Sequence, residues 1–202
     1  MKRIGIMGGT FDPPHIGHLQ MAQYAADKLS LEKVIFLPTG RIYYKTERTS
    51  PEDRLCMTKL AISENPVFEV SDIETSCDVY SYTANSLEKL KAMFLWAQLY
   101  FIVGADSLDY MESWKNPDKL FSLCTVVVVF RHGYTREQSL KKAEELKIRF
   151  GADIVFADMP RVDISSSEIR DRLRRGESVS GMVNEGVLEY IRQKNLYSGE
   201  DR

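Results

Sequence analysis

One segment near the start of this 202-residue chain constrains its fold more than any other. A short apolar run at residues 4–7 leads directly into Gly8-Gly9-Thr10-Phe11-Asp12-Pro13-Pro14-His15-Ile16-Gly17-His18. This pattern predicts a first β-strand, a glycine-rich turn and a helix that begins near His15. Adjacent glycines let backbone N–H groups approach an anion, and a helix start adds unpaired N–H groups and a positive dipole end. The segment therefore indicates phosphate binding, with His15 and His18 on one face of the helix start.

Charge and composition restrict how this turn could act. The chain has 27 Lys and Arg against 29 Asp and Glu, a formal net charge of −2, with 44% hydrophobic and 28% charged residues. These values are typical of an ordinary globular protein and give no general affinity for nucleic acid or an anionic membrane. Phosphate binding would therefore depend on locally placed groups. The longest apolar run, at residues 126–130, is too short to span a bilayer.

The N-terminus and the cysteines together favour a cytoplasmic protein. Residues 1–3 run directly into the predicted first strand, so we expect no signal peptide. Cys56, Cys77 and Cys124 form no C-x-x-C pair, which predicts reduced thiols in structural roles. We expect no metal site in the protein, because none of its three histidines lies near a cysteine in the sequence.

Short β-rich runs alternate with longer amphipathic segments. The predicted strands are residues 3–7, 34–37, 68–71, 99–103, 125–130 and 154–156. The predicted helices are residues 19–29, 51–63, 83–94, 136–150, 167–174 and 185–194. The alternation predicts an α/β protein with a Rossmann-like doubly wound parallel sheet and helices on both faces. We expect one domain over residues 1–202, with a small C-terminal helical portion at about 165–197 whose last helix packs against the far edge of the sheet.

Three segments rich in small or polar residues follow predicted strands. They are the glycine turn, Gly104-Ala105-Asp106 after residues 99–103, and residues 164–170, which open a helix after residues 154–156. In doubly wound sheets, ligands bind beyond the carboxyl ends of the strands, where the winding direction reverses. We therefore expect the three segments to meet at one crevice.

The glycine-rich turn fits neither of the two commonest phosphate-binding motifs. The chain lacks G-x-x-x-x-G-K-[ST], and residues 5–10 do not fit G-x-G-x-x-G. What remains is H-x-G-H at residues 15–18, which alone could be a glycine turn with two surface histidines. Residues 8–18 as a block resemble the opening of bacterial nicotinate mononucleotide adenylyltransferases, of the HxGH nucleotidylyltransferase superfamily. The resemblance implies that superfamily's fold and transfer of AMP from ATP to nicotinate mononucleotide in NAD biosynthesis, with Mg²⁺ arriving on ATP.

A serine-rich segment resembles the family's ISSTxxR element. Ser165, Ser166 and Arg170 match it, and Ser167 stands in place of the threonine. Hydroxyls and N–H groups at a helix start suit phosphate oxygens, and an arginine offers a bidentate fork. Taken alone, the segment is also a plain N-cap, with Ser165 or Ser166 as the cap and Glu168 completing a capping box.

Gly104-Ala105-Asp106 resembles the family's GAD motif. The resemblance implies that Gly104 admits the nucleotide closely and that Asp106 accepts hydrogen bonds from the ribose hydroxyls, a use that suits a carboxylate. The alternative is that Asp106 caps a helix at residues 107–113.

Two further elements resemble the family's pyridine site. Tyr82 and Thr83 match its SYT element, and Trp114 matches its downstream tryptophan. The resemblance implies that backbone N–H groups at Thr83 bind the pyridine carboxylate while the indole stacks on the ring. The alternatives are a helix N-cap at Thr83 and a partly buried core aromatic at Trp114.

One family motif is altered here. The family's P-P-H-K/R loop corresponds to Ile42-Tyr43-Tyr44-Lys45, so only Lys45 carries over, as a phosphate contact. Loss of two prolines should loosen this loop, because proline reduces the freedom of the unbound chain. The resemblance otherwise extends from Lys2 to about Tyr197.

The resemblance also distributes roles among these residues. It assigns His15 and His18 to the bridging and leaving phosphates, and Lys45 and Arg170 to charge neutralisation. ATP would contact Gly8, Gly9, His18, Gly104, Asp106, Ser165, Ser166, Ser167 and Arg170. The acceptor would contact Thr10, Phe11, Tyr82, Thr83 and Trp114, with backbone N–H groups of residues 9–11 on its phosphate. That phosphate is already ionised, so catalysis would be positioning and charge stabilisation.

Other functions remain open at this point. Another adenylyl- or cytidylyltransferase of the same fold, such as one acting on phosphopantetheine, would share the H-x-G-H block. An aminoacyl-tRNA synthetase would need a KMSKS segment and a basic surface, which this acidic chain lacks. A nucleotide-sensing module without turnover is favoured by the altered loop at residues 42–44 and opposed by both histidines and Arg170. The choice between nicotinate and nicotinamide forms, and between a monomer and a homo-oligomer, also stays open.

Overall fold

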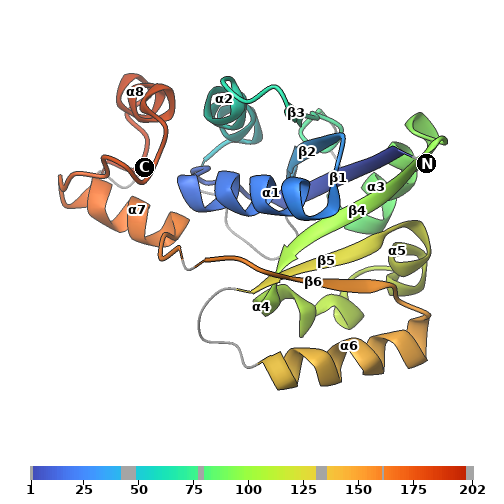
Figure 1. Cartoon of the computed structure of the whole chain (residues 1–202). Coiled ribbons are helices and arrows are strands. Elements are labelled where there is room, and N and C mark those ends of the chain that lie inside the picture. The colour runs from blue at the N-terminus through green and yellow to red at the C-terminus, as the bar shows by residue number, and fades with distance from the viewer. Residues whose placement is uncertain (1, 42–48, 77–79, 131–135, 161, 199–202) are drawn as a thin grey trace.

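A parallel six-stranded sheet organises the protein (Figure 1). The computed structural model describes residues 2–41, 49–76, 80–130, 136–160 and 162–198. Its strands are β1 (Lys2–Gly9), β2 (Lys33–Pro38), β3 (Phe68–Val70), β4 (Ala97–Gly104), β5 (Thr125–Phe130) and β6 (Ile154–Asp158). They lie in the order β3-β2-β1-β4-β5-β6, and every neighbouring pair is parallel. The winding direction reverses between β1 and β4, so the carboxyl ends of these two strands mark the expected ligand crevice.

Helices cover both faces of the sheet. They are α1 (Ile16–Leu29), α2 (Pro51–Ile62), α3 (Thr83–Met93), α4 (Ala105–Leu108), the 3₁₀ helix Met111–Ser113, α5 (Pro117–Leu123), α6 (Arg136–Phe150), α7 (Ser166–Arg174) and α8 (Glu185–Gln193). One apolar core contains side chains of α1, α2, α7 and α8, and a second contains side chains of α3, α4, α5 and α6. The predicted doubly wound α/β fold is therefore confirmed. Within the described ranges, no helix has the length and apolarity needed to cross a membrane.

The valine run of β5 shows how the sheet is buried. Val126, Val127, Val128 and Val129 are all completely buried. Val127 and Val129 belong to one core, whereas Val126 and Val128 belong to the other. Because successive side chains of a strand point to opposite faces, a continuous apolar run is what an inner strand covered on both sides requires.

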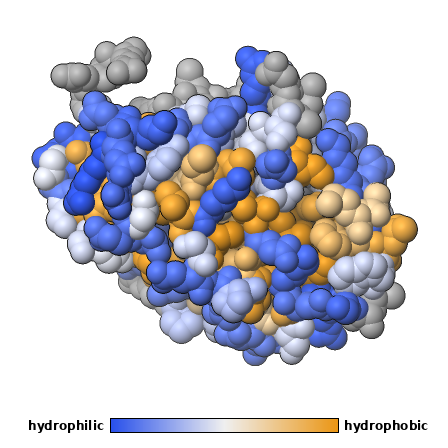
Figure 2. Space-filling model, turned by 90° about the horizontal axis from the view of Figure 1, so that it is seen from above, coloured by the Kyte–Doolittle hydropathy of each residue, from blue (hydrophilic) through white to orange (hydrophobic). Residues whose placement is uncertain are grey.

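Figure 2 shows one face of the surface, on which apolar residues gather across the middle among hydrophilic ones. Large exposed apolar side chains include Met93 at the end of α3, and Leu95 and Trp96 in the turn that follows it. This turn precedes β4, so it lies at the opposite end of the sheet from the carboxyl ends of the strands.

All six predicted strands are present, with ends within two residues of the prediction. All six predicted helices are present too, whereas α4, the 3₁₀ helix and α5 were not among them. The expected placement of the last helix is wrong, because α8 packs mainly against α2 rather than against the edge of the sheet. Val187 and Ile191 of α8 share a core with Met57 of α2, which gives the apolar face of α8 a helix as its partner.

Candidate active site

The turn after β1 is shaped by close contacts with aromatic rings. Phe11 has a φ of 51°, in the left-handed region that a bulky side chain rarely adopts. Its buried ring lies over Gly9, where an added Cβ would come within 3.0 Å of the ring. An added Cβ at Gly8 would lie 3.3 Å from the ring of Phe101. The two glycines therefore let the end of β1 pass between rings, and a backbone held in a rare conformation is typical of functional turns.

His15 and His18 lie together at the start of α1, as their spacing predicts. His15 is the N-cap residue and is buried, and the two rings stack with centroids 3.6 Å apart. The backbone N–H of His15 donates to Nδ1 of His18 at 3.2 Å. Because Nδ1 accepts, a neutral His18 carries its proton on Nε2 and can donate from that atom.

The N-terminus of α7 contacts the same turn, which confirms that these segments meet. Ser166 Oγ donates to the Pro13 carbonyl at 2.9 Å. Arg170 Nη1 donates to the Asp12 carbonyl at 2.6 Å, and its Nη2 donates to Ser167 Oγ at 3.2 Å. The guanidinium is therefore fixed beside the turn that contains the histidines.

Ser165 has the N-cap role that the sequence left open between Ser165 and Ser166. It is the N-cap of α7, and its Oγ accepts the backbone N–H of Glu168 at 3.2 Å. The Glu168 carboxylate forms an ion pair with Arg172 at 2.7 Å. The cap is thus present at Ser165, while Ser166 and Ser167 bind the β1 turn and Arg170 instead.

Gly104 ends β4 beside β1, which places the GAD segment at the switch point. Gly104 is the N-cap of α4, and an added Cβ there would lie 2.4 Å from Oδ1 of Asp106. Asp106 is exposed and lies inside α4. The alternative that Asp106 caps a helix at residues 107–113 is therefore wrong: the segment forms two short helices, α4 and the 3₁₀ helix, because the chain turns between them.

The Tyr82–Thr83 segment is attached to the end of β2. Gly40 N–H donates to Ser81 Oγ at 2.9 Å, and Ser81 N–H donates to the Arg41 carbonyl at 3.0 Å. Thr83 is the first residue of α3, and Tyr82 is the N-cap without a side-chain cap bond. The alternative of an N-cap at Thr83 is therefore wrong, because the helix begins one residue too early for it.

The ring of Phe101 lies between Trp114 and the end of β1. Its indole is half-buried and meets Phe101 edge-on, with centroids 6.1 Å apart. Phe101 in turn faces Gly8. Trp114 packs against the core, as the alternative of a partly buried core aromatic predicted, and it remains partly exposed.

Sequence analysis missed Arg54, which lies on α2 and is fully buried. Its guanidinium donates to the carbonyls of Thr10 at 2.9 Å, Thr39 at 2.6 Å and Gly40 at 3.1 Å. Its Nε donates to the Thr49 carbonyl at 3.3 Å. Arg54 therefore joins the ends of β1 and β2, and an arginine in an amphipathic helix gives no sequence signal for such a position.

Glu74 is a second buried polar group that the sequence did not single out. Its Oε1 accepts the Ser86 hydroxyl at 2.6 Å. An added Cβ on Gly40 would lie 2.2 Å from the Glu74 carbonyl oxygen, so only glycine allows this approach. Burial raises the pKa of the Glu74 carboxyl above its ordinary value of 4.5.

The sequence predicted Lys45 as a phosphate contact, and this residue lies outside the described residues, as do Ile42, Tyr43, Tyr44 and Cys77. Of the two cysteines that are described, Cys124 is buried and Cys56 is half-buried.

Comparison with known proteins identifies the family. A model of the cytidylyltransferase-like family matches residues 6–172. A Clostridium novyi (strain NT) protein named "probable nicotinate-nucleotide adenylyltransferase" is 41% identical over 199 residues, which are 98% of this chain and the whole of that protein. A Desulfitobacterium hafniense (strain Y51) protein of the same name is 40% identical, over 97% of this chain and 96% of its own. The chain belongs to the nicotinate-nucleotide adenylyltransferase family.

Solved structures share the fold of this family member. The Plasmodium falciparum nicotinic acid mononucleotide adenylyltransferase in complex with NaAD superposes with a TM-score of 0.81, at 22% identity and over 98% of both chains. The same enzyme in complex with APC gives a TM-score of 0.77. The nucleotidylyltransferase type of fold expected from the H-x-G-H block is therefore confirmed.

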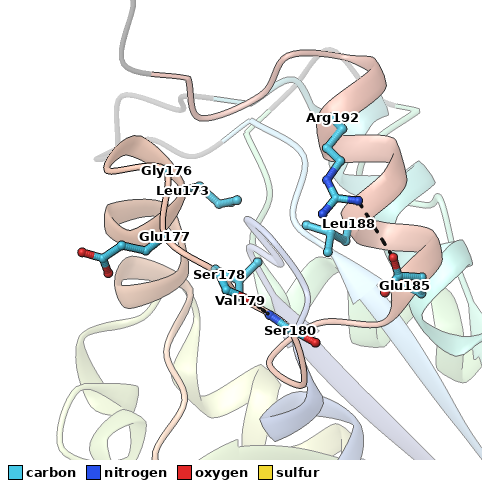
Figure 3. Close-up of a pocket in the computed structure, with 9 residues that line it drawn as sticks. All are labelled: Leu173, Gly176, Glu177, Ser178, Val179, Ser180, Glu185, Leu188 and Arg192. Carbon is cyan, nitrogen blue, oxygen red and sulfur yellow. Dashed lines mark hydrogen bonds and ion pairs between the residues drawn. The ribbon is translucent and has the colours of Figure 1, made fainter.

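The adenylyltransferase fold here also has a hollow between α7 and α8, with a volume of about 440 Å³ (Figure 3). Along its α8 side, Arg192 and Glu185 form an ion pair at 4.0 Å. It is lined by Leu173, Gly176, Glu177, Ser178, Val179, Ser180, Glu185, Leu188 and Arg192. None of these nine residues was predicted for the site.

Proposed function

We propose that this protein transfers AMP from ATP to nicotinate mononucleotide, forming nicotinate adenine dinucleotide and pyrophosphate in NAD biosynthesis. Its family membership over nearly the full chain supports this function. The observation that carries the proposal is the meeting of the β1 turn, its stacked histidines and Arg170 at the switch point between β1 and β4. These groups are the kind that a transferred phosphoryl group needs around it.

In this mechanism, the chain supplies position and positive charge rather than a nucleophile. An oxygen of the mononucleotide phosphate attacks the α-phosphorus of ATP, and the bond from that phosphorus to the bridging oxygen breaks as pyrophosphate leaves. His15 and His18 would bind the bridging and leaving phosphates, with His18 donating from Nε2. Arg170 and Lys45 would neutralise the charge that develops on the leaving group.

Substrate positioning would use the remaining residues of the predicted site. Backbone N–H groups of Gly9, Thr10 and Phe11 would bind the acceptor phosphate. The start of α3 at Tyr82 and Thr83 would bind the pyridine carboxylate through backbone N–H groups, because the first N–H groups of a helix have no partner within it. The indole of Trp114 would stack on the pyridine ring.

ATP would lie along the other segments. Gly8 and Gly104 would let it approach the backbone, and the exposed carboxylate of Asp106 would accept ribose hydroxyls. The hydroxyls of Ser165 and Ser167 would donate to phosphate oxygens, whereas Ser166, whose hydroxyl donates to the Pro13 carbonyl, would do so through its backbone N–H. Ser165 keeps this ability, because its cap uses an oxygen lone pair and leaves the hydroxyl hydrogen available.

We propose that magnesium arrives bound to ATP. Among the described residues, no group of three or more His, Cys, Asp or Glu could hold a metal ion. Mg²⁺ keeps several waters and binds substrate phosphates rather than an all-protein cage, so the ion would need no dedicated protein ligand. We further propose that the protein acts in the cytoplasm on small molecules, without nucleic acid or membrane partners.

Pyrophosphate release from ATP and Mg²⁺ tests the function. Nicotinate mononucleotide, nicotinamide mononucleotide and 4′-phosphopantetheine are offered separately to the purified protein. We expect the nicotinate form to be strongly preferred, because buried polar groups matched to one ligand reject its analogue. Activity with 4′-phosphopantetheine alone would reassign the acceptor, and tight dinucleotide binding without any pyrophosphate release would indicate a sensing module instead.

A further inference from the structure

A tyrosine from the C-terminal segment reaches the β1 turn. Tyr197 follows α8 and has a φ of 60°. Its hydroxyl donates to Oδ1 of Asp12, which lies 185 positions earlier in the sequence. Asp12 is only 8% exposed, so its carboxylate depends on protein donors. The contact therefore joins the end of the described chain to the turn that contains the histidines.

Asp12 also contacts Arg170 through a different atom. Its carbonyl accepts Arg170 Nη1 at 2.6 Å, while the adjacent carbonyl of Pro13 accepts Ser166 Oγ at 2.9 Å. Asp12 thus binds Tyr197 through its side chain and α7 through its backbone. Asp12 is therefore the single residue that links Tyr197 to Arg170, whose guanidinium is assigned to the triphosphate.

The charges explain why the tyrosine hydroxyl is needed. Burial and the Asp12 carboxylate raise the pKa of Tyr197, so its hydroxyl stays protonated and remains a donor. Thr49 also forms a hydrogen bond with this hydroxyl, and the Arg170 charge acts on it as well. Without the donor, the buried Asp12 carboxylate would need another partner, because a buried carboxylate without one is costly. The Arg170 guanidinium, which already binds the Asp12 backbone carbonyl, is a cation that could turn toward it.

We propose that Tyr197 is a positioning residue for the AMP-transfer site: its hydroxyl binds the Asp12 carboxylate and thereby leaves the Arg170 guanidinium directed at the triphosphate of ATP. The inference rests on the proposed function for the identity of the reaction. It does not depend on which acceptor is used, since Arg170 is assigned to the triphosphate of ATP and not to the acceptor.

Tyr190 provides a matched control within the same segment. Its hydroxyl donates to Oδ1 of Asp53 at 2.8 Å, so it too forms a phenol–carboxylate bond between the C-terminal segment and the first half of the chain. Tyr190→Phe and Tyr197→Phe therefore each remove one phenol–carboxylate bond, to the half-buried Asp53 and to the buried Asp12 respectively, and of the two tyrosines only Tyr197 binds the β1 turn. We expect Tyr197→Phe to lower kcat/KM for ATP about tenfold, and Tyr190→Phe to change it by less than about twofold.

A double-mutant cycle with Arg170→Ala tests whether Tyr197 acts through Arg170. If it does, Tyr197→Phe lowers kcat/KM about tenfold in the wild-type background and has almost no further effect when Arg170 is absent. Equal losses in both backgrounds would overturn the proposal, and so would an equal loss in Tyr190→Phe, which would indicate a general structural effect.

ATP affinity, measured by calorimetry on the same variants without an acceptor, separates this inference from the proposed function. We expect Tyr197→Phe to weaken ATP binding only when Arg170 is present. This result would support the inference even if nicotinate mononucleotide proved not to be the acceptor. Unchanged ATP affinity together with unchanged kcat/KM in Tyr197→Phe would overturn it.

Discussion

At the scale of single residues, His18 shows how one backbone N–H sets the chemistry of a side chain. The His15 N–H occupies Nδ1 of His18, so the proton of the neutral ring lies on Nε2. Removing a preorganised donor to a developing charge costs about 10²–10³ in kcat, so we expect this loss in His18→Ala with a smaller change in KM. Steady-state kinetics with ATP and nicotinate mononucleotide measures both. Turnover equal to the wild type would exclude His18 from the proposed site.

Glu74 predicts a specific dependence of stability on pH. Burial raises its pKa in the folded protein, so the folded state binds its proton more tightly than the unfolded state does. Its contribution to stability is therefore present below the ordinary pKa of 4.5 and is lost as the pH rises through the folded value. Glu74→Gln keeps an oxygen that can accept the Ser86 hydroxyl and removes this loss. We expect the free energy of unfolding of the variant, relative to the wild type, to increase from acidic to neutral pH in urea titrations; a constant difference would contradict the prediction.

At the scale of elements, Arg54 attaches α2 to the ends of β1 and β2 through four backbone carbonyls. A lysine cannot replace this planar fork, because it offers one ammonium in place of five N–H donors. Since buried acceptors without donors cost about 1–3 kcal/mol each, we expect Arg54→Lys to lower the free energy of unfolding by about 2–4 kcal/mol.

Arg172→Lys is the matched control for this prediction. Arg172 has the same side chain as Arg54 and forms an ion pair with Glu168. In this pair, however, both side chains are 39% exposed. Exposed pairs contribute about 0–1 kcal/mol, so the control should lower the free energy of unfolding by less than about 1 kcal/mol. Urea titration compares the two variants, and equal small losses would show that Arg54 does not join these elements energetically.

The elements themselves were largely predictable from the sequence, because their signals are local. Apolar runs and helical spacing located all six strands and six helices. The longest of the missed helices, α5, has only seven residues and follows Asn116, whose φ is 55°. So short a segment does not span enough turns for a helical period to emerge. The placement of α8 was wrong because an amphipathic face shows that a partner exists without showing which one.

Of the candidate site, the sequence could predict only which segments the sheet topology brings together. The β1 turn and the GAD segment lie at the switch point because parallel strands end at the same edge. The contact of Tyr197 with Asp12 joins residues 185 positions apart, and the carbonyls bound by Arg54 come from three separate segments. Such contacts depend on side-chain packing in three dimensions, for which a single sequence has no local pattern.

At the scale of the whole molecule, one sheet separates two apolar cores. Val127 is completely buried in the core with α1, α2, α7 and α8, and Val128 is completely buried in the core with α3, α4, α5 and α6. The two residues are neighbours in β5, so both cores depend on the same strand and its hydrogen bonds. We therefore predict that the cores unfold together, as one domain over residues 1–202 requires.

Matched valine truncations test this cooperativity. Val127→Ala and Val128→Ala each remove two buried methyl groups, on opposite faces of the sheet, and each should lower the free energy of unfolding by about 2 kcal/mol. In both variants, urea unfolding followed by tryptophan fluorescence and by far-UV circular dichroism should give one coincident transition with an unchanged slope, because loss of either core breaks the strand that the other needs. Separated transitions in either variant would instead show that each face of the sheet folds as an independent unit.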